Sequence, residues 1–354
     1  MSNLSDYVAI LASSDEAERA YAAEDLGYLN MPEAVTPLLE RLPAETSAVV
    51  RDAIFQALLR IEGDGAVVGA IGLLTSDDSQ IRNLAVTLLH RRGNQSIPFL
   101  KQAMQEGDRD TRKFVLDAVR GMPYSCAEDI YAVALADDDT NVVITAVENL
   151  GNLRANAFRN RIEDLLQRDA HPMLVAACLE ALAGIGNESS LTVIHKCFPD
   201  LAELPGFSLA PCLKALGALG GKKEFEQVLG LLPARAAQLY PAILGALIQL
   251  YEHSVNEGYR PPEASENVLI ALRTLVESNE PPPCRYQAAR VLGFWSDRED
   301  VSASLVSCLT SLEKMVRLGA AEALRISNRP ELATILAAYE VDETKREVDQ
   351  PLGR

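Results

Sequence analysis

Apolar and polar positions along this chain follow helical spacing, in stretches that come in pairs. Residues 50–58 carry valine, alanine, isoleucine and leucine three or four positions apart, and residues 67–74 do so again after a short polar interruption. This spacing places the apolar side chains on one face of a helix. The pattern therefore predicts two amphipathic helices joined by a turn, and strand-like alternation is hard to find anywhere in the chain.

The paired pattern recurs about every 30–32 residues. An arginine stands just before the apolar stripe of the first helix in the clearest units, namely Arg19, Arg51, Arg82, Arg112, Arg285 and Arg317. A repeat of this length with two helices per unit is the signature of an α-solenoid, in which each repeat buries its apolar face against its neighbours. The repeat thus predicts an elongated array in place of separate globular domains.

The regularity of the repeat divides the chain into segments. Residues 1–197 repeat regularly, residues 198–283 less so, and residues 284–340 resume the regular pattern. The irregular segment contains a proline- and glycine-bearing stretch at 252–265 that predicts a long loop between helices. The last residues, 341–354, are polar, and we expect them to form a mobile tail.

Two features repeat around the first helix of each unit. An acid precedes the arginine by four residues in Asp15–Arg19, Asp78–Arg82, Asp108–Arg112 and Glu313–Arg317. On a helix such a pair shares one face, and the acid also lies where it can cap the N-terminus. We therefore predict a structural role in capping and repeat register. Glycines recur at the other end of these helices, at Gly27, Gly151, Gly184, Gly217 and Gly293, where a left-handed residue could end the helix.

Four stretches carry a resemblance to a known family: "VVRDAIFQALLRI", "QIRNLAVTLLH", "RYQAARVLGFW" and "MVRLGAAEALRI". They resemble HEAT repeats, in the short variant found in phycobilin-lyase-like bacterial proteins. The resemblance covers most of residues 13–338 and is weakest at 198–283. It implies an all-α fold, an α-solenoid of about ten HEAT-like two-helix repeats. Proteins of this kind act mostly as scaffolds and adaptors, some attach or remove bilin chromophores, and others accompany bacterial signalling systems.

In this family the second helices usually line the concave surface. Carried over to this chain, the resemblance predicts partner-binding residues at outward-facing positions of the second helices: Glu40, Arg41, Lys101, Gln102, Glu163, Asp164, His195 and Lys196. Gly69 and Gly72 at the comparable positions of another unit would leave a bare helix face. A further candidate docking element is the loop around Tyr259 and Arg260, because long loops inside compact arrays are often functional.

Charge and composition limit the classes of partner and the compartment that we expect. The net charge is −17 over 354 residues, with a pI of about 4.8, which disfavours nucleic acid and membrane surfaces as partners. The apolar stretch at 239–250 is too short to span a bilayer, and the N-terminus lacks a signal-peptide pattern. The six cysteines are dispersed and are predicted to be buried thiols in a reducing compartment. We therefore expect a cytoplasmic protein.

No motif supports chemistry at a defined site. His195 and Cys197, with Cys178 and Cys212 in neighbouring helices, form the one candidate metal cluster, but they lack the ligand spacing typical of zinc or iron–sulfur sites. The glycines at 217–221 lack the spacing of a phosphate-binding loop. We accordingly expect no metal, no cofactor and no catalytic residues.

Two functional hypotheses remain. The first is a non-enzymatic scaffold or adaptor that binds one or more proteins along the concave face or an acidic edge, for example in bacterial signalling. The alternative is a phycobilin lyase or a related chromophore-handling protein with an antenna client, which rests on the repeat type alone. The bilin client belongs only to this alternative.

Overall fold

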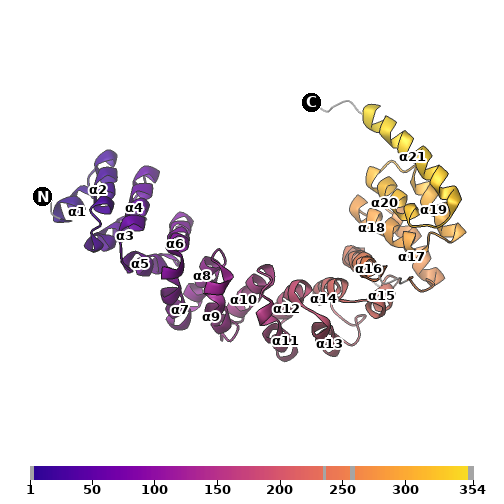
Figure 1. Cartoon of the computed structure of the whole chain (residues 1–354), viewed down its shortest axis with the longest axis horizontal. Coiled ribbons are helices and arrows are strands. Elements are labelled where there is room, and N and C mark those ends of the chain that lie inside the picture. Colours follow the sequence, from indigo (N-terminus) through magenta and orange to yellow (C-terminus); the bar gives the residue numbers. More distant parts are fainter. Residues whose placement is uncertain (1–3, 234–236, 256–259, 350–354) are drawn as a thin grey trace. The chain divides into compact units, whose positions relative to one another are not determined.

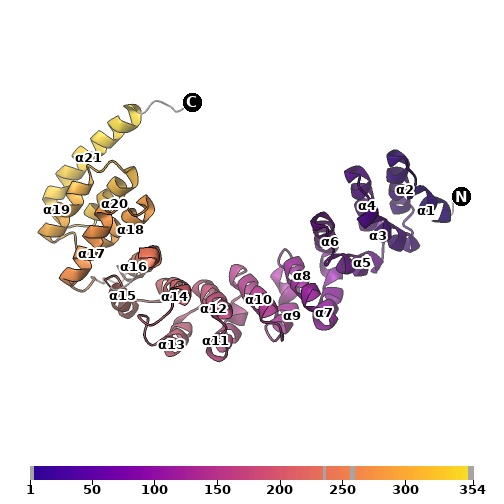
Figure 2. The ribbon, with the colours of Figure 1, turned by 180° about the vertical axis from the view of Figure 1, so that it is seen from behind.

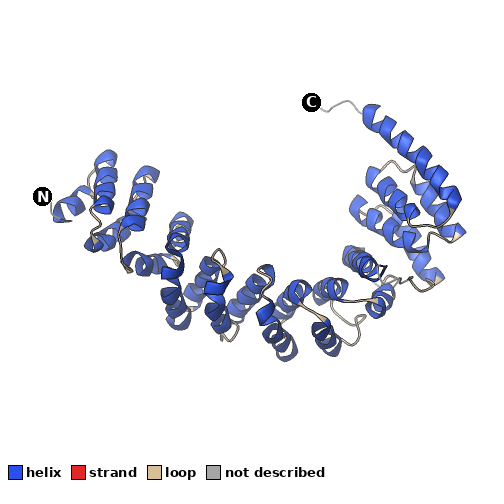
Figure 3. Cartoon of the chain, viewed as in Figure 1, coloured by secondary structure: helices blue, strands red, loops and turns tan. Residues whose placement is uncertain are grey.

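The computed structural model describes residues 4–233, 237–255 and 260–349, and in these residues it contains helices and connecting turns but no strand (Figure 3). The helices come in pairs along the chain, as Figure 1 shows. Ten pairs can be counted in the described residues, from α2 with α3 to α20 with α21. The predicted all-α solenoid of about ten two-helix repeats is confirmed.

The chain divides into two compact units, residues 1–155 and 156–354. Unit 1 contains a short leading helix and then alternating first and second helices. They are α1 (Leu4–Ile10), α2 (Glu16–Tyr28), α3 (Val35–Ala44), α4 (Ala48–Arg60), α5 (Gly65–Leu73), α6 (Ser79–Arg92), α7 (Ile97–Glu106), α8 (Arg109–Val119), α9 (Tyr124–Ala134) and α10 (Thr140–Asn152).

Unit 2 continues the alternation. Its helices are α11 (Arg159–Arg168), α12 (Pro172–Ile185), α13 (Glu188–Cys197), α14 (Gly206–Leu219), α15 (Lys222–Leu229), α16 (Tyr240–Val255), α17 (Glu266–Glu277), α18 (Pro282–Leu292), α19 (Glu299–Cys308), α20 (Lys314–Arg325) and α21 (Pro330–Asp349). We call the even-numbered helices α2 to α20 the first helices and their odd-numbered successors the second helices. The division into 1–197, 198–283 and 284–340 stays a prediction.

The first helices begin where the sequence predicts caps. Asp15 accepts hydrogen bonds from the backbone N–H groups of Ala17 and Glu18, and Asp78 and Asp108 cap α6 and α8 in the same way. Each bond satisfies an N–H group that has no partner inside the helix. The capping role predicted for the repeated aspartates is therefore confirmed.

The repeated arginines close the turn in front of their own helix. One guanidinium nitrogen of Arg19 donates to the backbone oxygens of Ser13 and Ser14, at 3.0 and 3.2 Å. Arg82 and Arg317 reach the carbonyls five and six residues before them in the same manner. These bonds satisfy carbonyl groups that the turn leaves without helical partners.

Among the repeated arginines, Arg19 and Arg112 also reach forward, to a carboxylate at the start of the next repeat. Arg19 binds Glu45 through two nitrogens at 2.8 and 3.0 Å, and Arg112 binds Asp137 at 2.7 Å. Their ion pairs thus link consecutive repeats, and the arginine does not pair with the acid four residues before it, as the helical spacing had suggested. Arg317 binds Glu343 of α21 at 2.6 Å, so here the second helix of the same pair supplies the carboxylate.

Gly27 and Gly293 act through close packing, and none of the five recurrent glycines has the left-handed conformation that was expected to end the helices. Gly27 lies inside α2, and a β-carbon there would stand 2.7 Å from the Cα atom of Ala57 in α4. Gly293 and Ala323 repeat this contact at 2.7 Å. The glycines with positive φ in the described residues are Gly63 and Gly93. The small residues therefore allow neighbouring first helices to approach closely.

In unit 2 this close approach has a geometric consequence. The first helices α12, α14, α16, α18 and α20 pack directly against one another in sequence, whereas the second helices contact each other much less. The first helices accordingly form the inner row of the curve within this unit and the second helices the outer row, as both views show (Figures 1 and 2). The expectation that second helices line the concave surface is wrong for unit 2, because the row that packs more tightly becomes the shorter one.

The predicted loop at 252–265 is shorter than expected, since α16 continues to Val255. Its described end is tied to the body of unit 2: the indole N–H of Trp295 donates to the backbone oxygen of Pro262 at 2.8 Å. Trp295 itself is buried in the short 3-10 turn Gly293–Trp295. The predicted polar tail also begins within a helix, because α21 extends through residues 341–349.

Replacing Trp295 with phenylalanine should detach the described end of this loop. Phenylalanine keeps most of the buried ring but cannot donate to Pro262, so we expect a loss of about 1–2 kcal/mol in the free energy of unfolding. Hydrogen exchange at residues 263–265 should become faster than in the wild type. Unchanged exchange there would show that the indole bond does not hold the loop.

Candidate partner-binding surface

The structure disperses the eight partner-binding residues predicted on the second helices. Glu163 is buried: its carboxylate accepts hydrogen bonds from the hydroxyls of Ser190 at 2.5 Å and Ser189 at 3.1 Å, and lies 3.6 Å from Arg159. It fastens α11 to the start of α13. Its prediction as an outward-facing binding residue is therefore wrong.

His195 and Arg41 are likewise engaged within the protein. The His195 ring nitrogen Nε2 lies 2.7 Å from a carboxylate oxygen of Glu224 in α15, a contact between two repeats. Burial of Glu224 opposes its ionisation, but hydrogen bonds from the backbone N–H of Gly221 and from His195 lower the pKa of its carboxyl. Arg41 binds the buried Glu45 at 2.7 Å. His195 therefore links two repeats, and Arg41 helps to hold the carboxylate that also binds Arg19.

The other predicted residues lie at the surface, where Lys101 and Lys196 contact the preceding or following repeat and Gln102 contacts its own helix. Lys101 binds Asp129 at 2.6 Å, Gln102 donates to Glu106, and Lys196 donates to Gln167. Glu40 and Asp164 are exposed, and a role for these residues in binding stays a prediction.

The predictions for the two glycines of α5 and for the loop have different outcomes. A β-carbon at Gly69 would collide with Leu39 of α3, whereas one at Gly72 would meet open space. Only Gly72 therefore fits the predicted bare face, and Gly69 serves packing between repeats. Arg260 is exposed, and Tyr259 lies outside the described residues.

A different set of residues is exposed at a fixed place in the repeat. Val49, Met173, Phe207 and Met315 are each the second residue of a first helix and stand nine residues before a buried leucine. Nine residues correspond to two and a half helical turns, so these side chains lie opposite that leucine. Sequence reasoning followed only the buried stripes and missed them; their signal is an apolar residue on the face where polar residues are normal.

In unit 2 these positions lie on the inner row. Met173 and Phe207 are 50% and 51% exposed on α12 and α14, which pack directly against each other. Two turns further along the same helices, Lys214 forms an ion pair with Glu180. The exposed surface of this helix pair is thus apolar near the N-termini and charged farther along, an arrangement that suits a protein partner with an apolar anchor and a polar rim.

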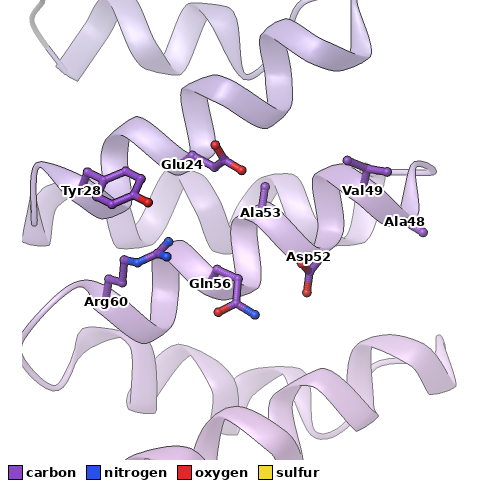
Figure 4. Close-up of a pocket in the computed structure, with 8 residues that line it drawn as sticks. All are labelled: Glu24, Tyr28, Ala48, Val49, Asp52, Ala53, Gln56 and Arg60. Carbon is purple, nitrogen blue, oxygen red and sulfur yellow. The ribbon is translucent and has the colours of Figure 1, made fainter.

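Unit 1 contains a groove between α2 and α4, the two first helices nearest its N-terminus. The hollow encloses about 420 Å³ and is lined by Glu24 and Tyr28 of α2 and by Ala48, Val49, Asp52, Ala53, Gln56 and Arg60 of α4. In Figure 4, Tyr28 and Arg60 lie together at one end, Ala48 and Val49 at the other, and the two acids with Gln56 between them. Tyr28 and Val49 are 71% and 63% exposed, so the groove offers apolar surface as well as charge.

The cysteines and histidines do not assemble into a metal site. Burial raises the pKa of the Cys178 and Cys212 thiols to about 12, which makes them unreactive at neutral pH. In the described residues no group of three or more histidine, cysteine or acidic side chains is placed to hold a metal ion. The cysteines whose side chains the structure describes are all free thiols.

No helix in the described part of the chain is both long and apolar enough to cross a membrane. No curated protein matches the sequence. Residues 18–42, which span most of α2 and most of α3, match the model of the PBS lyase HEAT-like repeat.

Solved structures with a similar fold include repeat proteins that bind other proteins. A chain from a structure of Kap95p with RanGDP is 13% identical, with a TM-score of 0.60 and 99% of this chain covered. The alignment spans about half of that chain, 54%. A structure of Kap121p bound to Pho4p is 16% identical, with a TM-score of 0.46, covering 90% of this chain and 41% of the other. An engineered protein, 17% identical with a TM-score of 0.46, covers 92% of this chain and 98% of its own.

At these identities the similarity concerns the fold alone. The match at residues 18–42, the repeated helix pairs and the similarity to Kap95p agree with one another. The chain is an α-solenoid of HEAT-like repeats.

Proposed function

We propose that this protein is a non-enzymatic scaffold that binds another protein through the exposed surface of its first helices. The observation that carries the proposal is the exposure of Met173 and Phe207 on adjacent, directly packed helices of unit 2. Large apolar side chains that recur exposed at one repeat position are typical of an interaction surface. A protein of similar fold has a protein partner, as in the structure of Kap95p with RanGDP.

The surface replaces the second-helix site expected from the sequence. Curved solenoids use their inner surface for extended binding, and in unit 2 the first helices form that inner row. The neighbouring Glu180–Lys214 pair supplies the polar rim. We place the protein in the cytoplasm, where free thiols such as Cys178 and Cys212 are stable.

The test replaces both anchors. We expect the double substitution Met173→Ser and Phe207→Ser to weaken the partner at least about tenfold, because each buried apolar anchor contributes about 1–2 kcal/mol. The measurement begins with purification of the tagged protein from its host at moderate salt, followed by titration of the purified partner. Stability should change little, since both side chains are half exposed already.

Ile270 and Val341 provide a matched control. Both are large, apolar and about half exposed, at 51% and 56%, but they lie on the second helices α17 and α21. The double variant Ile270→Ser and Val341→Ser should retain the partner. Equal losses in the two double variants would argue against the first helices as the binding surface.

The bilin-handling alternative is supported by the PBS lyase HEAT-like match at residues 18–42. It predicts that the protein co-purifies with a coloured antenna subunit from a bilin-producing host. Absence of absorbance from a tetrapyrrole in such a preparation would count against it.

A further inference from the structure

We infer that the groove between α2 and α4 binds an extended basic segment of a partner protein, with an arginine or lysine held by Glu24 and Asp52 beside an apolar residue on Val49. The inference deepens the proposed scaffold function and rests on it. It concerns unit 1 alone, whereas the proposed anchor surface lies in unit 2.

The charge of the groove favours a cationic ligand. Glu24 and Asp52 are exposed and line the hollow from its two sides. Neither carboxylate forms an ion pair or a hydrogen bond with the described protein. By contrast, the carboxylates of Glu45 and Asp137 in the same unit are committed to arginines. The groove therefore presents two negative charges that remain available to a cation.

The apolar surface of the groove favours a basic side chain over an inorganic cation. Val49 stands at one end of the groove, Ala53 forms part of its buried wall, and the Tyr28 ring stands at the other end. Arginine and lysine have long hydrocarbon stems that pack on apolar surface while the charged head reaches a carboxylate. A simple metal cation would gain nothing from this surface. The combination favours a basic side chain over an inorganic ion.

The Tyr28 ring already binds one cation of the protein itself, the guanidinium of Arg60. The Arg60 guanidinium stacks over Tyr28 at 4.6 Å from the ring centroid, so this end of the groove carries a positive charge. The groove thus changes sign along its length, from Arg60 at one end to the acids in the middle (Figure 4). A bound segment would place its basic residue over the acids and direct a carbonyl oxygen towards Arg60.

Gln56 indicates the conformation of the ligand. Its side chain lines the groove, is only partly exposed, and makes no hydrogen bond with the residues that the structure describes. An amide has both donor and acceptor groups, which match the free N–H and C=O groups of an extended backbone. A helical ligand would already have satisfied those groups. An extended segment therefore uses Gln56 and a helix does not.

The test uses a short fluorescein-labelled peptide of repeated Gly-Arg-Leu units, with a citrulline version as the uncharged counterpart. Fluorescence anisotropy with the full-length protein should show binding of the arginine peptide that weakens with added salt, and much weaker binding of the citrulline peptide. We expect the double variant Glu24→Gln and Asp52→Asn to raise the Kd of the arginine peptide about fivefold, as two partly exposed ion pairs are lost.

Asp117→Asn with Glu148→Gln is the matched control. It removes the same two charges from other first helices of unit 1, α8 and α10, outside the groove. If the affinity falls equally in both double variants, general attraction to an acidic protein explains the binding and the inference is overturned. No binding of the arginine peptide to the wild type would overturn it as well.

A competition experiment separates a peptide from a small polyamine. Spermidine should displace the labelled peptide only at far higher concentration than an unlabelled arginine–leucine peptide, because it has no apolar side chain to place on Val49. Equal potency would assign the groove to polyamines and overturn the peptide. None of these outcomes alters the test with Met173 and Phe207, so the groove can fail while the scaffold proposal stands.

Discussion

Replacing Glu45 with glutamine should lower the free energy of unfolding of the N-terminal repeats by about 3 kcal/mol, since breaking a buried ion pair leaves an uncompensated charge. The Glu45 carboxylate is buried and joins two arginines: Arg19 at 2.8 Å and Arg41 at 2.7 Å. It also accepts the backbone N–H groups of Thr46 and Ser47 at 3.0 and 2.9 Å. Glutamine can retain only part of this set, because one of its two oxygens becomes a donor.

The effect of Glu45 should depend on pH in a defined direction. The hydrogen bonds from Arg19, followed by those from Ser47 and Arg41, outweigh burial and lower the pKa of this carboxyl from 4.5 to about 2. Because the folded pKa is the lower one, the unfolded chain binds more protons in this range and stability rises with pH. The difference between wild type and Glu45→Gln should therefore be fully present above about pH 5 and should shrink as the pH falls through 4.5 towards 2.

Urea unfolding followed by circular dichroism, together with hydrogen exchange in α2 and α4, would measure this difference. Glu40→Gln is the control, since Glu40 lies on the same helix α3 as Arg41 but is exposed. We expect it to change stability by less than about 0.5 kcal/mol. Similar effects of the two substitutions would mean that Glu45 does not connect the repeats as its bonds suggest.

The second large effect is expected at Gly27. An added β-carbon would stand 2.7 Å from the Cα atom of Ala57 and 3.0 Å from its Cβ atom. Since the obstacle includes backbone, relief requires α2 and α4 to move apart, and overpacking of this kind costs about 1–3 kcal/mol. The better helix propensity of alanine returns at most about 1 kcal/mol. Gly27→Ala should therefore destabilise unit 1 by about 1–2 kcal/mol in net terms.

Gly72 provides a matched comparison, in which the expected change in stability has the opposite sign. It lies in the last turn of α5, and a β-carbon there would meet nothing within 4 Å. Gly72→Ala should therefore stabilise the protein, by up to about 0.5–1 kcal/mol. Thermal unfolding of the two variants beside the wild type tests both signs at once. If Gly27→Ala proved as stabilising as Gly72→Ala, the close contact between the first helices would not be a constraint.

Repeat period, helix pairs and buried stripes were all predictable from the sequence. These features are local: the spacing of apolar residues sets the helix face, and an aspartate before the stripe, such as Asp108, caps the helix through bonds within one turn. The all-α solenoid follows because helices with one apolar face must stack to bury it.

Long-range partners were not predictable in the same way. Glu163 has the polar character of a surface residue, yet Ser189 and Ser190 of the next repeat bury it. Arg19 has an acid at ideal helical spacing in Asp15, but Glu45 offers two oxygens to its two nitrogens while Asp15 is occupied by the helix N-terminus. Each choice depends on how one repeat lies against the next, and a pattern within one repeat contains no information about it.

The sequence by itself determined an α-solenoid of about ten helix pairs with aspartate caps and a net charge of −17, because short-range spacing and composition decide these properties. The tertiary structure alone decided which helices face inward in unit 2 and which exposed residues share a surface. In unit 2, Gly293 allows α18 and α20 to approach, because a β-carbon there would stand 2.7 Å from the Cα atom of Ala323. The first helices of unit 2 pack more tightly than the second helices, and they form the inner row of its curve. The candidate binding site therefore changes from the second helices, as expected from the sequence, to the groove and the exposed apolar residues of the first helices.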